Sequence, residues 1–142
     1  MKRVLATICL LIILMSGLAV AEDNEAPRSL LREYRGDVKM PDGLYETYAE
    51  LVKVMRGDHE QIKEFCLPHA ITITTGGRPK EMREYGPMNL PFLMSGFHAN
   101  ILHLRKDSED TYLIRTGSSY LYFVRTKTMG WKLYHYGDKP IA

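Results

Sequence analysis

Apolar residues fall at helical intervals between residues 42 and 66. One set falls on a single helix face, in a segment that Asp42 can cap and Gly57 can end: Leu44, Tyr48, Leu51, Val52 and Met55. A second helix is expected to begin at Asp58, because Gln61 three residues later completes a pattern similar to a capping box, and Pro68 would stop it. Two helices are therefore predicted before residue 69.

The second half carries the alternation of apolar and polar residues that is typical of strands. One strand is expected over residues 70–75, followed by a glycine pair. Prolines break the stretch 78–97, which predicts only a short helix near 80–85. Four further runs joined by short turns predict an antiparallel meander: 98–106, 110–116, 119–126 and 131–136. Helices followed by such a meander indicate an α+β fold.

The N-terminal residues have the organisation of a secretory signal peptide. A basic start precedes an apolar run over residues 4–15, and Ala19 and Ala21 frame a cleavage site of small residues. We therefore expect cleavage after Ala21 and export to the periplasm or out of the cell; the alternative is an uncleaved N-terminal anchor. The chain then divides into three parts: a leader at 1–21, an N-terminal arm at 22–42 with a short helical turn near 29–34, and a domain at 43–142.

Cleavage of that leader changes the charge. The full chain has 19 basic and 17 acidic residues, and the leader removes Lys2 and Arg3 and no acid, so 17 of each remain. Nucleic acids and anionic membranes bind to basic protein surfaces, and a domain with no net charge gives no sign of such a surface. We therefore expect neither partner. The leader also removes Cys9, which leaves Cys66 without an internal disulfide partner, and its apolar neighbours indicate a buried thiol.

Turn chemistry predicts how the strands of the meander pair. Gly117 and Ser118 suit a two-residue hairpin turn, which places Thr116 opposite Ser119. Counting outward from this turn gives three more pairs: Ile114 with Leu121, Tyr112 with Phe123, and Asp110 with Arg125. A loop around Asp107 and a loop over 128–130, with Gly130 in the left-handed conformation, give the other pairs: His103 with Tyr112, Arg105 with Asp110, His135 with Phe123, and Leu133 with Arg125.

This register gives the two faces of the sheet different characters. One face gathers a candidate pocket: His103, Tyr112, Phe123, His135, Arg105, Asp110 and Arg125. The opposite face is apolar and rich in tyrosine, which suits a protein interface: Tyr120, Tyr122, Tyr134 and Tyr136. Both faces are therefore expected to be covered, one by the helices and the other by a second subunit.

Two short motifs carry a resemblance to a known family. Residues 56–60 (RGDHE) and 65–68 (FCLP) look like its helix-to-strand entry, and 130–135 (GWKLYH) looks like its last strand. Over about residues 43–137 the chain resembles the nuclear transport factor 2-like (SnoaL-like) superfamily. The resemblance implies a cystatin-like cone, with N-terminal helices packed in the concavity of a curved antiparallel sheet. It also implies that the candidate pocket lies on the concave face and that the tyrosine-rich face often packs a dimer.

The chain also departs from this family at particular residues. The association domain of calmodulin-dependent kinase II tends to end in a His-x-His pair, whereas His135 here is followed by Tyr136. The arginine of the preceding strand in that domain falls, by spacing, on Tyr122. Isomerases and dehydratases of the superfamily use an acidic or histidine base inside the cone, and none maps residue by residue onto this chain.

The candidate pocket supports several hypotheses of function. His103, Tyr112 and His135 could transfer protons, and Arg105 and Arg125 could hold a carboxylate or phosphate. Asp110 would be a poor base between two arginines, so we expect a non-enzymatic domain that binds a small apolar or anionic ligand, or assembles with itself or another protein as a homodimer. The alternative is a cone-pocket isomerase, dehydratase or hydrolase, and a third interpretation has the pocket filled by its own side chains. The five histidines lack metal-ligand spacing, and we expect neither a metal nor another cofactor.

Overall fold

The computed structural model describes residues 26–57, 59–73, 77–84 and 97–140 of the chain. The predicted signal peptide, its cleavage site after Ala21 and the capping residue Asp58 lie outside the described residues, as do residues 85–96 of the proline-containing stretch 78–97.

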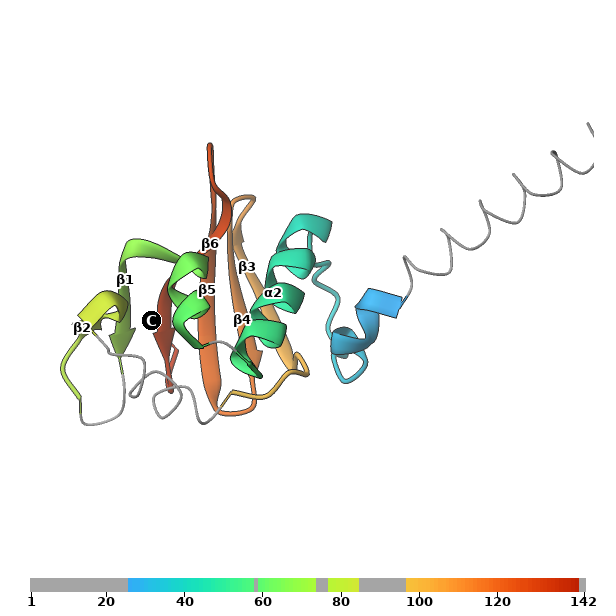
Figure 1. Ribbon diagram of the computed structural model, residues 1–142. Coiled ribbons are helices and arrows are strands. Elements are labelled where there is room, and N and C mark those ends of the chain that lie inside the picture. The colour runs from blue at the N-terminus through green and yellow to red at the C-terminus, as the bar shows by residue number, and fades with distance from the viewer. Residues whose placement is uncertain (1–25, 58, 74–76, 85–96, 141–142) are drawn as a thin grey trace, which may run out of the picture.

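The fold is α+β, with one main helix and a curved, mixed, six-stranded sheet (Figure 1). Its helical elements are α2 (Asp42–Met55) and three 3-10 turns, η1 (Ala26–Leu31), η2 (His59–Phe65) and η3 (Met82–Glu84). Its strands are β1 (Cys66–Ile73), β2 (Lys80–Glu81), β3 (His103–Ser108), β4 (Thr111–Thr116), β5 (Ser119–Thr126) and β6 (Gly130–Gly137). They lie in the order β2-β1-β6-β5-β4-β3.

The sheet is mixed because β1 runs parallel to β6, whereas the other neighbouring strands are antiparallel. The antiparallel meander of β3 to β6 is confirmed, and the prediction of a wholly antiparallel sheet is wrong. A parallel pair requires a long connection between its two strands, and here the rest of the sheet supplies it. The residues of a tight turn predict only how the two strands joined by that turn pair. Strands β1 and β6 are far apart in the chain, so no turn sequence predicts their pairing.

The predicted helix over the first apolar run is confirmed as α2. Its buried residues share one face: Leu44, Tyr45, Tyr48, Leu51 and Val52. Asp42 is the first helical residue rather than the cap, and its negative charge lies in the first turn, where the helix dipole favours it. The helix ends at Met55, two residues before Gly57, whose backbone N–H donates to the carbonyl oxygen of Val54 at 3.1 Å.

The second predicted helix is only the 3-10 turn η2, and Pro68 does not end it. Strand β1 begins directly after η2 at Cys66 and contains Pro68. The pairing of β1 with β6 is irregular between Cys66 and Ile71, so a residue without an N–H is accommodated there. The expected helix near 80–85 is likewise replaced by the short strand β2 and the turn η3.

The core lies between α2 and one face of the sheet, which is called the helix face below (Figure 1). Tyr48 is fully buried there, and its hydroxyl donates to the carbonyl oxygens of Ala99 at 2.9 Å and His98 at 3.3 Å. The sheet contributes large apolar side chains to the same core cluster: Leu104, Tyr112, Ile114, Leu121, Phe123, Trp131, Leu133 and Tyr136. These contacts fix α2 across the strands of the meander.

The end of the N-terminal arm is docked on the domain. Leu30 accepts a hydrogen bond at its carbonyl oxygen from the N–H of Ile101 at 2.8 Å, and the side-chain amide of Asn100 donates to Glu33 at 2.9 Å. Leu30 and Tyr34 pack against the core as partly buried side chains. Residues 29–40 therefore contribute to the same hydrophobic core as α2.

Candidate functional site

The register predicted for the hairpin of β4 and β5 is confirmed. Thr116 lies opposite Ser119, and Tyr112 lies opposite Phe123. Gly117 has a positive φ of 54°, and no described non-glycine residue does, which matches a type II′ turn with glycine at its first central position. The expected pair beyond the strand end also forms, because Arg125 donates from Nε to Oδ1 of Asp110 at 2.7 Å.

The predicted register of β3 against β4 is wrong by three residues. His103 lies opposite Arg115 rather than Tyr112, and Arg105 lies opposite Leu113 rather than Asp110. A shift by an odd number turns every side chain of a strand to the other face. The observed register is favoured because it buries Leu104 on the helix face, whereas the predicted register would have placed charged side chains there.

A turn shorter than predicted, between Ser108 and Thr111, and an irregularity in β3 together account for this difference. The pairing with β4 shifts between Lys106 and Ser108, and Ser108 then lies opposite Thr111. The prediction treated the residues after Lys106 as loop, while the structure continues the strand through an extra residue. Arg105 consequently pairs with Asp107 of its own strand, with Nε–Oδ1 at 2.7 Å and Nη2–Oδ2 at 3.1 Å.

The predicted register of β6 against β5 is also wrong. Trp131 lies opposite Arg125 and Leu133 opposite Phe123, and the register then shifts so that His135 lies opposite Tyr122. A bulge adds one residue to a strand and reverses the facing of those beyond it. His135 therefore lies on the outer face of the sheet, and Tyr136 turns into the core.

The seven residues of the candidate pocket are consequently not gathered on one face. Tyr112 and Phe123 remain on the helix face, packed in the core. His103 is exposed, His135 is on the outer face, and Arg105 is beside Asp107. Asp110 and Arg125 form an ion pair whose side chains are about half exposed. His103 and His135 thus lie on the opposite side of the sheet from Tyr112.

The tyrosines of the candidate interface occupy three different environments. Tyr136 is buried in the core, where its hydroxyl shares a 2.6 Å hydrogen bond with Ser119 and burial raises its pKa to about 12. Tyr122 lies on the outer face yet is only 1% exposed. Tyr120 and Tyr134 are half-buried on that face. Placing Tyr136 with the other three was therefore wrong, for the bulge turns it inward.

Side chains of the same sheet cover the middle of the outer face. The guanidinium of Arg105 lies 5.8 Å from the ring centre of Tyr122, and the rings of Tyr134 and His135 meet it edge-on at 5.9 and 5.1 Å. Towards β4, the guanidinium of Arg115 lies 5.7 Å from the ring centre of Tyr120. The outer face is therefore an alternation of aromatic rings and arginines.

His135 is a buried polar side chain on the outer face. Its side chain is 3% exposed, and its Nε2 has no hydrogen-bond partner in the part of the chain that the structure describes. Burial lowers its pKa, which keeps the ring neutral. The backbone beside it is tight, because a Cβ added at Gly137 would lie 2.5 Å from the carbonyl oxygen of Ile73.

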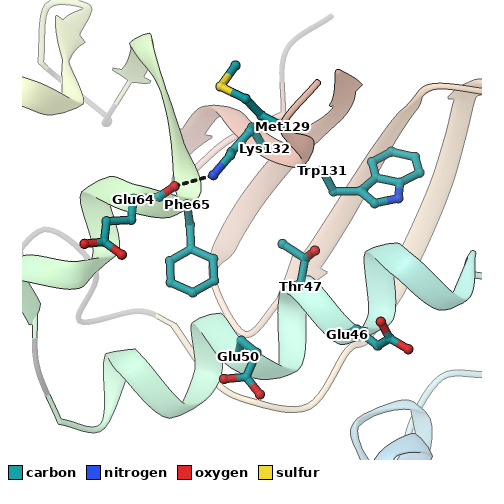
Figure 2. A pocket seen from close by; sticks show the side chains of 8 residues that line it. All are labelled: Glu46, Thr47, Glu50, Glu64, Phe65, Met129, Trp131 and Lys132. Carbon is teal, nitrogen blue, oxygen red and sulfur yellow. Dashed lines mark hydrogen bonds between the residues drawn. The ribbon is translucent and has the colours of Figure 1, made fainter. Parts of the chain in front are cut away.

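A groove that the sequence did not predict lies where α2, η2 and the start of β6 meet (Figure 2). It has a volume of about 390 Å³ and eight lining residues: Glu46, Thr47, Glu50, Glu64, Phe65, Met129, Trp131 and Lys132. These residues come from three separate segments of the sequence. The sequence offers one hint of the groove, the pair Glu46 and Glu50 four positions apart. Such a pair is also typical of an ordinary solvated helix face.

Residues 26–57, 59–73, 77–84 and 97–140 contain neither a cluster of metal ligands nor a membrane-spanning helix. These ranges contain no group of three or more His, Cys, Asp or Glu residues that could hold a metal ion. They also contain no helix with the length and apolar character needed to cross a membrane. Cys66 is a half-buried thiol whose Sγ lies 3.4 Å from the carbonyl oxygen of Ile62, and burial raises its pKa to about 12.

The sequence was compared with protein-family models and with curated proteins. No protein-family model matches the chain, and no curated protein matches it either. Functional proposals for this chain therefore depend on the geometry of its own residues.

Proposed function

We propose that this chain is a non-enzymatic, exported domain with a cone fold of the nuclear transport factor 2-like (SnoaL-like) kind, and that it acts by self-assembly through the outer face of its sheet. Support for the fold comes from the curved six-stranded sheet and from α2, which lies across the helix face. The export step depends on the predicted signal peptide. Self-assembly is supported by two features: the space between α2 and the sheet is filled by side chains, and the outer face of the sheet carries aromatic rings.

The filled interior favours binding at the surface over catalysis in the cone. Tyr48, Phe123 and Leu133 are all fully buried between α2 and the sheet, in the space where the cone pocket was expected. Close packing of this kind leaves no room for a substrate beside Tyr112. The alternative function, an isomerase, dehydratase or hydrolase that uses buried His and Tyr groups, loses its support because His103 and His135 both lie away from this interior.

One observation carries the proposal, namely the aromatic and arginine surface on the side of the sheet opposite α2. Tyr120 and Tyr134 keep part of their rings exposed, and Arg115 stacks on the first of them. Tyrosine and arginine are over-represented among the residues that dominate binding energy in protein interfaces. Their stacking also limits the side-chain entropy that association would remove.

The strand edges favour contact through the face rather than through strand addition. At one edge, β3 carries the charged residues Arg105, Lys106 and Asp107 and an irregular register, both of which hinder pairing with another chain. At the other edge, β2 has only two residues. A second copy of the chain is therefore proposed to pack face to face on β4, β5 and β6.

Sedimentation velocity on the chain, purified after export by the producing cell, tests the proposal. We expect a dimer whose dissociation constant rises at least about tenfold in Tyr120→Ser with Tyr134→Ser, because interface aromatics each contribute about 1–2 kcal/mol or more. Met129→Ser, which removes an exposed apolar side chain away from this face, is the control and should leave the dimer intact. A monomer at all concentrations would overturn self-assembly, and intact mass would report whether cleavage follows Ala21.

A further inference from the structure

The groove between α2, η2 and β6 has aromatic walls on two sides. Figure 2 shows Phe65 on one side and Trp131 on the other, with Thr47 of α2 between them. Its volume of about 390 Å³ is within the range of small-molecule sites in proteins, about 300–1,000 Å³. The groove therefore has room for a small organic molecule with an apolar body.

The charges around the groove select the sign of that molecule. Its charged lining residues are three glutamates (Glu46, Glu50 and Glu64) and one lysine (Lys132), so the groove has a net charge of −2. Glu50 is partly neutralised by Lys53, whose Nζ lies 2.7 Å from Oε1 on the exposed face of the helix. The carboxylates of Glu46 and Glu64 have no ion-pair partner among the described residues, so they are available to a bound cation.

Lys132 does not cancel this negative potential across the whole groove. Its Nζ donates to the backbone carbonyl oxygen of Glu64 at 2.6 Å, as the dashed line in Figure 2 marks. The ammonium is thereby held at one side, while Glu46 lies on the other side beside Trp131. The end of the groove near Glu46 is therefore the more favourable position for a second positive charge.

Trp131 is held rigidly in the wall. Its side chain is 7% exposed, the ring of Tyr112 meets it edge-on at 5.6 Å, and the guanidinium of Arg125 lies 5.6 Å from its ring centre. A Cβ added at Gly43 would lie 3.3 Å from its Nε1, so the ring also fits closely against the start of α2. An indole fixed in this way needs no reorganisation to contact a ligand.

We propose that this groove binds a small organic cation, with its apolar body against Phe65 and Trp131 and its ammonium group at the carboxylate of Glu46. This ligand class differs in charge from the anionic ligand that the sequence suggested. The site is separate from the outer face, so neither proposal depends on the other. Because the carboxylates are exposed, the charge selects the ligand more than it strengthens the binding.

Three probes of nearly the same shape isolate the effect of charge. We would titrate the exported chain with 4-phenylbutylamine, 4-phenylbutanol and 4-phenylbutyrate, which are cationic, neutral and anionic. Trp131 is the one tryptophan of the chain, so its emission reports on the groove, and ligand-observed NMR measures binding in parallel. We expect the amine to bind at least about fivefold more tightly than the alcohol and the carboxylate not to bind. Equal binding of all three, or no binding of the amine by either method, would overturn the proposal.

Charge-removing variants give effects of opposite sign on the same titration. Glu46→Gln should weaken binding of the amine about two- to fivefold and Glu64→Gln, at the other side of the groove, should weaken it less, whereas Lys132→Gln should strengthen it. Glu109→Gln, a change at an exposed glutamate on the β3–β4 turn, is the matched control and should have no effect. If Glu46→Gln leaves the affinity of the amine unchanged, the assignment of the cation to this groove is wrong. Circular dichroism would establish that each variant is folded.

Discussion

The two faces of the sheet bury their side chains by different means. On the helix face, Phe123 and Leu133 are covered by a second layer, the helix α2. On the outer face, Tyr122 is equally buried, yet the described groups around it are Arg105, Tyr134 and His135 of the same sheet. Long side chains with an apolar stem and a polar tip can thus shield an apolar row and still present a surface suited to a partner.

The largest expected effect tests whether the helix face supplies most of the stability. Phe123→Ala should lower the free energy of unfolding by about 3–5 kcal/mol, because it leaves a cavity in a packed core. Tyr134→Ala, on the outer face, should cost about 1 kcal/mol or less, because its ring is only partly buried. Urea denaturation of the two variants measures both values. Similar losses for the two would mean that the outer face is as important for folding as the core.

A smaller effect tests the placement of Tyr136 on the helix face. Tyr136→Phe removes the 2.6 Å hydrogen bond to the buried hydroxyl of Ser119 and should cost about 1 kcal/mol. The same change at half-buried Tyr134 is the matched control and should alter stability by less than about 0.5 kcal/mol. Equal losses for the two changes would contradict the bulge in β6, because without it Tyr134 and Tyr136 would lie on the same face of the sheet.

The smallest expected effect is a pH dependence that arises from His135 on the outer face. Burial lowers its pKa in the folded chain, so below an imidazole pKa of about 6.5 the unfolded chain takes up a proton that the folded chain does not. Stability should therefore be complete above about pH 6.5 and fall as the pH is lowered towards the folded pKa. Denaturation at a series of pH values should show this slope in the native sequence.

Substitution of His135 identifies the source of that slope. His135→Gln removes the titrating ring and should flatten the curve, whereas His103→Gln, at an exposed position of the same face, should leave it unchanged. A slope that survives in His135→Gln would place its origin elsewhere in the chain. The dimer test with Tyr120 and Tyr134 then shows whether this face has a role beyond stability.

Local signals in the sequence predicted the elements whose neighbours are close in the chain. The helical spacing from Leu44 to Val52 placed α2, since one turn of helix brings apolar residues onto a common face. Gly117 placed the β4–β5 register because a two-residue turn permits few backbone conformations. Gly130 has the positive φ of 70° that was expected, yet the register of β6 still came out wrong.

Bulges explain why the candidate site could be predicted only in part. One extra residue near Lys106 and another near Tyr134 changed the facing of His103, His135 and Tyr136. Period-two alternation could not reveal them, because both faces of this sheet are largely apolar and either facing looks acceptable. The groove at Trp131 escaped prediction for another reason, which is that its walls meet only through the packing of α2, η2 and β6.

The sequence by itself determined the α+β class, the helix α2, the meander and the pairing of β4 with β5, because short-range spacing and turn geometry fix each of these. Tertiary structure alone decided the parallel pairing of β1 with β6, the positions of the bulges and the acidic groove. The physical reason is that these features arise from contacts between residues distant in the chain. Burial of Leu104 and Tyr136 in a shared core, rather than any local preference, selects among registers that are otherwise alike.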